Sequence, residues 1–277
     1  MLLRCAVAAP LLFQSDKMKA YCINLDRRPD RLEYITAEFA RMGVPFERVS
    51  AVDGQDPDVA AAAARLSATA AGAPMSTGAY ACFQSHREIW RRLLISGAPH
   101  AMAFEDDLLL SPGLTPFLQD GWVPADADLV KMETFGTRIH VAAGQGLAVR
   151  DRHLRRLRSY HRGTGCFVIS AGAAARLLAA TETFSEAIDT YLFSETSPAF
   201  AGLVTYQMIP APVIQGDRAG AGRSQAWSKS SIEERFAPGV AVQRMQKETR
   251  LGRLQRRLSE EVRGRLNGTR YVFVPHG

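Results

Sequence analysis

Short apolar runs alternate with longer amphipathic segments at the start of the chain. Residues 19–25 (KAYCINL) carry one charge, at the first position, which predicts a buried strand. Residues 29–42 then repeat an apolar side chain every three or four positions, which predicts a helix that Gly43 ends. Residues 46–49 predict a second short strand. Such a strand–helix–strand opening predicts a parallel sheet with its ligand at the carboxyl ends of the strands.

Similar patterns continue along the chain. Residues 58–73 are rich in alanine and are expected to be helical or mobile. A long helix is predicted to begin with Thr77 as its cap and to run to residue 95, where a Ser-Gly pair ends it. Residues 147–158 are dense in arginine and show no clear period. Further expected elements are strands over 101–104, 128–133, 166–170 and 203–210, the last being the final strand of the core, a helix over 173–180, and a flexible loop rich in Gly and Ser over 219–231.

Three consecutive acids, Glu105, Asp106 and Asp107, follow the apolar run at residues 101–104. Carboxylates are rarely buried unless they are paired or bind a metal. In an extended chain, Glu105 and Asp107 point the same way and Asp106 points the opposite way. Two oxygen ligands on one side suit Mg²⁺ or Mn²⁺, so Glu105 and Asp107 are the candidate metal ligands. The alternative is an acidic turn between a strand and a loop.

Composition limits the chain to one large domain or two small ones. It has 277 residues, of which 47% are hydrophobic, so a sizeable core is possible. The four cysteines form no CxxC pair, which argues against a zinc site or a disulfide framework. Cys22, Cys82 and Cys166 are expected to be buried free thiols, which fits a reducing compartment. Residues 5–13 are apolar but too short to span a bilayer, and residues 1–17 are predicted to be a dispensable extension.

The net charge of +6 is concentrated at the end of the chain. Residues 231–277 contain ten Lys and Arg against five Asp and Glu. Within them, arginines surround four apolar residues at helical spacing between positions 251 and 262. Such a helix can lie on an anionic membrane surface through residues 240–265, or it can pack on the core with a solvated outer face. No recognised nucleic-acid-binding module is visible, so no nucleic acid is expected as a partner.

Six segments resemble the motifs of one known family, glycosyltransferase family 25. This family includes bacterial lipooligosaccharide galactosyltransferases and the collagen galactosyltransferases. One segment is similar to the family's Gly-x-x-Gly-Cys-x-x-Ser-His motif, with Ala81 replacing the usual second Gly. The six segments are, in order, residues 23–32 (INLDRRPDRL), 51–54 (AVDG), 78–86 (GAYACFQSH), 104–107 (FEDD), 164–170 (TGCFVIS) and 188–192 (IDTYL).

The resemblance covers residues 19–232 and implies a fold, a reaction and a location. The implied fold is a single α/β domain of the GT-A type, a Rossmann-like mixed sheet flanked by helices, over residues 18–232. Beyond it, the charge and helical spacing described above predict a basic helical tail over 233–277. The implied reaction is an inverting transfer from a UDP-sugar, with a divalent metal on the donor diphosphate. UDP-galactose is the implied donor, and UDP-glucose stays open. The implied acceptor is a glycan such as lipopolysaccharide or a lipid-linked sugar, reached in the cytoplasm or on the inner face of the cell membrane.

The candidate donor-binding residues lie in the matching motifs. Arginines after the first strand can bind phosphate in a bidentate manner. Their alternative role is purely structural, as helix caps or as solvated residues on a helix surface. Asp53 can accept from ribose hydroxyls or the uracil N–H, and an Asp-Gly turn is its alternative role. His86 can orient a ligand through the acidic segment, whereas a lone helical His is more often structural. The full set is Asn24, Arg27, Arg31, Asp53, Ser85, His86 and Asp106.

An inverting transfer needs a base within hydrogen-bond reach of the acceptor hydroxyl. Asp189 is the candidate, because its apolar neighbours Phe184, Ile188 and Tyr191 would make its carboxylate a stronger base. The competitor is Glu133, which follows an apolar strand. The alternative role of Asp189 is to cap a helix that begins at the next residue.

Three classes of function compete at this point. The leading prediction is a metal-dependent glycosyltransferase. A non-catalytic GT-A-like protein, which binds a nucleotide sugar or recruits partners through the basic tail, is the alternative, and the intact Glu105-x-Asp107 pair argues against it. A metal-dependent phosphohydrolase would need more acidic and His ligands near one strand end than the sequence provides.

Overall fold

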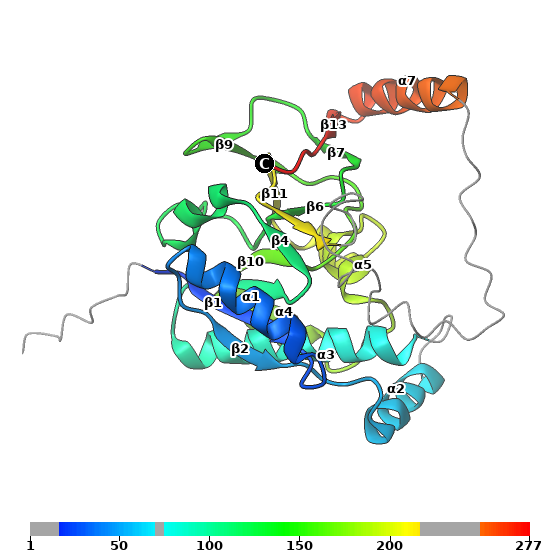
Figure 1. Cartoon of the computed structure of the whole chain (residues 1–277). Coiled ribbons are helices and arrows are strands. Elements are labelled where there is room, and N and C mark those ends of the chain that lie inside the picture. Colours follow the sequence, from blue (N-terminus) through cyan, green and yellow to red (C-terminus); the bar gives the residue numbers. More distant parts are fainter. Residues whose placement is uncertain (1–16, 70–74, 217–249) are drawn as a thin grey trace, which may run out of the picture.

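The computed structural model describes residues 17–69, 75–216 and 250–277. A sheet lies at its centre with helices around it (Figure 1). The sheet has eight strands in the order β2-β1-β3-β10-β5-β11-β9-β8. The strands β2, β1 and β3 are parallel, whereas β10 is antiparallel to both of its neighbours. The eight strands are β1 (Lys19–Asn24), β2 (Glu47–Ser50), β3 (His100–Glu105), β5 (Leu129–Lys131), β8 (Leu147–Val149), β9 (Arg152–Arg156), β10 (Cys166–Ser170) and β11 (Thr205–Ile209). The predicted mixed α/β sheet is confirmed.

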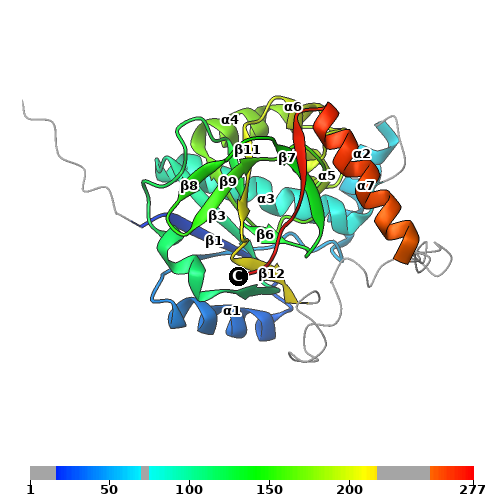
Figure 2. The same ribbon diagram turned by 90° about the horizontal axis from the view of Figure 1, so that it is seen from above.

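Helices cover both faces of this sheet (Figure 2). On one face lies α1 (Pro29–Arg41), and on the other lie α3 (Thr77–Ser96) and α4 (Ala171–Ala180). Alternate residues of β3 serve the two cores, since Ala101 and Ala103 pack with α3, while Met102 and Phe104 pack with α1. Shorter helices complete the layers: α2 (Pro57–Thr69), the 3₁₀ helix η1 (Pro112–Leu118), α5 (Ile188–Phe193) and α6 (Pro198–Ala201).

The helix boundaries follow the local signals in the sequence, with one correction. Gly43 and Gly97 end α1 and α3 with φ values of +67° and +68°, a conformation that glycine adopts without strain. However, Ser76 rather than Thr77 caps α3. The Ser76 backbone is extended and its hydroxyl accepts from the Ala79 N–H at 3.2 Å, so Thr77 is already the first helical residue.

Several strands were not predicted by sequence periodicity. The Arg-dense residues 147–158 form β8 and β9, and the inward positions of β9 are Arg152 and Leu154. Residues 203–210 do not hold the final strand, because two more follow β11. The first, β12 (Val213–Gln215), lies between β4 (Leu108–Leu110) and β6 (Glu133–Thr134). The second, β13 (Thr269–Phe273), pairs antiparallel with β7 (Arg138–Ala142).

The end of the chain joins the main body. A helix, α7 (Arg250–Leu266), precedes β13, and Val274 beyond β13 is completely buried. Thr134 Oγ1 donates to Val274 O at 2.6 Å, and the Gly277 N–H donates to Ala211 O at 3.0 Å. The tail therefore contains a strand as well as the expected helix. The predicted loop at 219–231 and almost all of the predicted extension at 1–17 lie outside the described residues, and the domain boundary at 232 stays a prediction.

Among the described residues, no helix is both long enough and apolar enough to cross a membrane. The cysteines in this part of the chain, Cys22, Cys82 and Cys166, are free thiols. Cys22 and Cys166 are buried as expected, whereas Cys82 is only partly buried.

Candidate active site

A pocket opens at the carboxyl ends of β1 and β3, where a parallel sheet commonly binds its ligand. Its cavity measures ≈ 340 Å³. Every predicted site residue except Asn24 and Glu133 lines it. The lining also includes residues that were not predicted, among them Cys82, Phe135, Arg162, Gly163, Thr164 and Gln215.

The three acids have different environments. Since β3 ends at Glu105 and the chain bends there, strict alternation does not extend through Asp106 and Asp107. Asp106 turns inward and accepts from Asn24 Nδ2 at 2.7 Å and from Arg31 Nη1 at 3.0 Å. Arg31 also donates to Asp107 Oδ2 at 3.3 Å. The side chains of Glu105 and Asp107 are 22% and 21% exposed, against 9% for Asp106, so the two predicted metal ligands are the more accessible acids.

The electrostatic balance also separates Asp106 from Glu105. Burial raises the pKa of Asp106, although Arg31 and Asn24 partly oppose the change. Burial would raise the pKa of Glu105 too, but hydrogen bonds from His86 and Thr164 bring it below its ordinary value. His86 Nε2 is 3.3 Å from Glu105 Oε1, and Thr164 Oγ1 donates to the same oxygen at 2.8 Å. Glu105 is therefore an ionised carboxylate at neutral pH.

Two sets of side chains could hold a metal ion in this pocket. Glu105 and Asp107 offer carboxylate oxygens, which Mg²⁺ and Mn²⁺ prefer. Cys82, His86 and Glu105 offer ligand atoms within 4.8 Å of one another, a mixed set that would suit Zn²⁺. The partly exposed carboxylates of Glu105 and Asp107 supply two hard oxygen ligands, whereas the second set supplies only one. The carboxylate pair therefore fits a hard cation such as Mg²⁺ or Mn²⁺.

The candidate donor-binding residues divide into surface and supporting groups. Arg27 Nε is 2.8 Å from Asp53 Oδ2 at the mouth of the pocket, where both side chains are partly exposed. Asp53 also accepts from the Gln55 N–H at 2.8 Å, so it has the turn role as well. Asn24 is buried against Asp106 and orients that acid instead of facing the cavity. Ser85 Oγ accepts from the Val52 N–H at 2.9 Å, which ties α3 to the AVDG segment.

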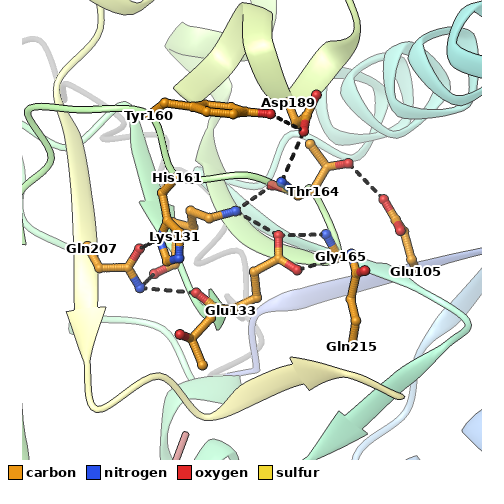
Figure 3. A network of polar contacts seen from close by, with 12 residues as sticks. Glu105, Lys131, Glu133, Tyr160, His161, Thr164, Gly165, Asp189, Gln207 and Gln215 are labelled. Atoms are coloured by element: carbon orange, nitrogen blue, oxygen red, sulfur yellow. Dashed lines mark hydrogen bonds and ion pairs between the residues drawn. The ribbon is translucent and has the colours of Figure 1, made fainter. Parts of the chain in front are cut away.

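Asp189 lies on the pocket wall at the start of α5 (Figure 3). Its Oδ2 accepts from Tyr160 Oη at 2.7 Å and from the Gly163 N–H at 3.2 Å. Its Oδ1 accepts from the Thr190 N–H at 2.8 Å. Ala187 occupies the cap position of α5, so Asp189 belongs to the first helical turn and is not the cap. The carboxylate is oriented by three donors and still reaches the cavity.

Glu133 has a different setting. It is completely buried, pairs with Lys131 at 2.6 Å and accepts from the Gly165 N–H at 3.0 Å. Burial is the main reason that its pKa rises to about 7, with Lys131 opposing the rise. A base needs access to the acceptor, so this burial favours Asp189 over Glu133 as the candidate.

Sequence reasoning missed Lys131, Tyr160 and Thr164. Thr164 begins one of the six family-like segments, and Lys131 is a charge between the apolar residues Val130 and Met132, so both positions carried a signal. Nothing in the Arg-dense stretch before Tyr160 distinguishes that residue.

Comparison with known proteins identifies the class and then the family. A sequence profile described as "Glycosyltransferase family 25 (LPS biosynthesis protein)" matches residues 17–192, which include all the predicted site residues. The chain belongs to glycosyltransferase family 25.

Similar proteins include two glycosyltransferases and one lipooligosaccharide biosynthesis protein. The lacto-N-neotetraose biosynthesis glycosyltransferase LgtE of Neisseria gonorrhoeae is 29% identical over 212 residues, covering 72% of this chain and 74% of LgtE. LgtB of Neisseria meningitidis serogroup B is 30% identical over 162 residues, covering 56% and 59%. The lipooligosaccharide biosynthesis protein lic2B of Haemophilus influenzae is 26% identical over 205 residues, covering 70% and 75%.

Two solved transferase structures match the chain with TM-scores below 0.5. One is a glycosyltransferase involved in glycosylation of the major capsid of PBCV-1, with a TM-score of 0.39, 8% identity and coverage of 72% of this chain and 93% of that one. The other is the inositol-1-phosphate CTP transferase from T. maritima, with a TM-score of 0.40, 12% identity and coverage of 78% and 96%.

Proposed function

We propose that this family 25 glycosyltransferase moves a hexose from a UDP-sugar to a cell-surface glycan such as lipopolysaccharide, with inversion at the anomeric carbon. Galactose is the proposed sugar, and glucose is the competing one. The observation that carries the proposal is that Glu105, Asp107 and Asp189 line one cavity at the carboxyl ends of parallel strands, with Arg27 and Arg31 beside them.

In this proposal the donor lies between the arginines and the acids. Asp53 accepts from the ribose or the uracil, and Arg27 contacts the diphosphate at the mouth of the pocket. Arg31 and Asn24 hold Asp106 in place and so shape the floor beneath the donor. Mn²⁺ or Mg²⁺ bound by Glu105 and Asp107 would neutralise the leaving diphosphate as a Lewis acid.

Asp189 is the proposed base. The acceptor hydroxyl attacks the anomeric carbon from the side opposite the diphosphate, the bond from that carbon to the diphosphate oxygen breaks, and Asp189 takes the hydroxyl proton. Tyr160 and the Gly163 N–H both bind Oδ2 and thereby orient the carboxylate. Burial and Asp189 together raise the pKa of Tyr160 to about 12, so the phenol stays a donor throughout the working range.

The proposal extends to the surface on which the enzyme works. The outer side of α7 exposes Leu258, Val262 and Leu266, and Phe273 of β13 is also exposed. Arginines lie along the same helix. An exposed apolar stripe with basic neighbours is typical of a helix that binds an anionic membrane surface, where a lipid-linked acceptor would be reached from the cytoplasmic side.

The test is transfer of labelled sugar from UDP-galactose and UDP-glucose to a cell-envelope extract, with donor affinity measured in parallel. Asp189→Asn keeps the shape of the side chain but accepts a proton poorly, so we expect unchanged donor affinity and a transfer rate lower by about 10²–10⁴. Asp151→Asn, which changes an exposed acid at the turn between β8 and β9, is the control and should transfer normally.

Near wild-type transfer by Asp189→Asn would contradict the assignment of the base. Donor binding without any transfer by the wild-type protein would instead favour the non-catalytic nucleotide-sugar-binding alternative.

A further inference from the structure

Gly163, Thr164 and Gly165 are here called the bridge segment. Gly163 and Thr164 line the pocket, and Figure 3 shows Thr164 between Asp189 and Glu105. The Gly163 N–H donates to Asp189 Oδ2 at 3.2 Å, and Thr164 Oγ1 donates to Glu105 Oε1 at 2.8 Å. The Glu105 N–H also donates to Gly165 O at 2.9 Å. Three consecutive residues therefore link the proposed base to a proposed metal ligand.

A buried ion pair supports the bridge segment. Lys131 Nζ lies 2.6 Å from Glu133 Oε1, and both side chains are 0% exposed. Lys131 also donates to the carbonyl oxygen of Gly163, and Glu133 Oε1 accepts from the Gly165 N–H at 3.0 Å. Each partner of the ion pair thus also binds one end of the bridge segment. The ammonium lies 4.4 Å from the centre of the Phe193 ring, a favourable position for a desolvated cation.

The pair and the bridge segment are in direct contact. A Cβ atom on Gly163 would lie 2.7 Å from Glu133 Oε1, and one on Gly165 would lie 2.7 Å from Glu133 Oε2. Both distances are shorter than a side chain tolerates, so glycine permits this approach. The Glu133 carboxylate therefore packs directly against the backbone of the bridge segment.

Stability alone does not account for this arrangement. Replacing a buried ion pair with neutral groups of similar volume is often neutral or stabilising, because desolvation of the charges offsets their attraction. The feature specific to this pair is that both partners bind backbone atoms of the bridge segment.

We propose that Lys131 and Glu133 are positioning residues, which hold the bridge segment so that Asp189 and Glu105 keep their orientation in the pocket. The roles of Asp189 and Glu105 rest on the proposed function. The contacts of Lys131 and Glu133 do not, so the two proposals can fail separately.

The test uses the full chain with Lys131→Met and Glu133→Gln combined. This double variant removes both buried charges together and leaves no unpaired ion. The new amide oxygen can still accept from Gly165, whereas the new thioether cannot donate to Gly163. We expect a folded protein, measured by thermal unfolding, with faster amide hydrogen exchange in the bridge segment. We expect kcat to fall by about 10–100-fold, the usual effect of a small misplacement, and the donor KM to rise as well, because Glu105 is a proposed ligand of the metal that holds the donor.

Arg152→Met is the matched control. Arg152 is also a buried cation that holds backbone carbonyls, since it donates to Pro210 O at 2.8 Å and to Gly277 O at 2.7 Å, both away from the pocket lining. Arg152→Met should speed amide hydrogen exchange near Pro210 and Gly277 and leave kcat unchanged.

Unchanged exchange in the bridge segment of the double variant would overturn the proposal, whether or not the protein transfers sugar. Faster exchange with unchanged kcat would overturn it as well. A wild-type protein that neither binds UDP-sugars nor transfers them would contradict the proposed function instead, and hydrogen exchange would still decide whether the ion pair holds the bridge segment.

Discussion

At Gly163, backbone conformation and side-chain packing restrict the same position. Its φ is +89°, and a Cβ atom there would lie 2.4 Å from Phe135 Cε2. Gly121 has nearly the same φ, +90°, but nothing lies within 4 Å of its Cβ position. Substitution of Gly121 therefore reports the free-energy cost of backbone strain alone, whereas substitution of Gly163 reports backbone strain together with side-chain crowding.

Gly163→Ala and Gly121→Ala are expected to differ for this reason. Gly121→Ala should lower the free energy of unfolding by about 1–2 kcal/mol, the cost of a left-handed residue with a Cβ atom. Gly163→Ala should cost about 1–3 kcal/mol more because of crowding, and it should reduce transfer because it displaces the bridge segment. Chemical denaturation and the transfer assay measure both effects. Equal stability and equal activity of the two variants would contradict this account of the pocket wall.

The sequence identifies individual site residues when their chemistry contrasts with their neighbours. Three acids after an apolar run stand out, and all three line the pocket. Sequence spacing does not reveal whether a carboxylate faces a cavity or a buried partner. Glu133 follows an apolar strand much as Glu105 does, yet the antiparallel pairing of β10 with β5 brings the bridge segment against Glu133. Its partner and its burial depend on strand order, which no local pattern encodes.

The helix α7 has one side that contacts the rest of the protein and one apolar side that is exposed. Glu260 and Gly264 lie on the contacting side, where Glu260 Oε2 lies 2.9 Å from His140 Nε2 and Gly264 packs against Thr269. Leu258 and Val262 lie on the other side and are 54% and 58% exposed. The apolar stripe therefore points away from the core, which favours the membrane alternative over packing on the core.

Substitutions in this stripe test the membrane proposal better than removal of the tail, because a truncation would also delete β13. Leu258→Gln combined with Val262→Gln should weaken binding to anionic vesicles by about tenfold or more, since the apolar area available for burial is lost. Binding of the intact protein should also weaken as salt rises. Ile95→Gln is the control, because Ile95 is an apolar residue of α3 that is 85% exposed. Equal vesicle binding by all three proteins would rule out α7 as the membrane-binding element.

Elements with a local period were predictable, and those held by distant partners were not. The amphipathic period and the stop glycine located α1 and the end of α3. In contrast, β9 buries Arg152 at an inward position. The sequence of this strand therefore lacks the alternation of apolar and polar residues that identifies a strand. The partner of β13 is β7, more than a hundred residues earlier in the chain, and such pairing leaves no signal within the strand itself.

For the whole molecule, the sheet order brings the predicted motifs together. Parallel pairing of β1 with β2 and β3 places the residues after all three strands at one edge. The loop before β10 and the start of α5 complete the cavity from the opposite side. A strand–helix–strand opening predicts the first half of this arrangement. The second half depends on the antiparallel insertion of β10, which the motif order alone does not specify.

The central claim is that this pocket binds a UDP-sugar together with a divalent cation at Glu105 and Asp107. The most direct measurement is calorimetric titration of UDP-galactose into the wild-type protein, with Mn²⁺ and after chelation, and into Asp107→Asn. Asp30→Asn, which changes an exposed acid of α1 outside the pocket lining, is the control. We predict that chelation and Asp107→Asn each weaken donor binding by at least about tenfold, or about 1.4 kcal/mol, while the thermal unfolding midpoint of the variant stays unchanged. The same UDP-galactose affinity with Mn²⁺, without it and in Asp107→Asn would contradict the claim.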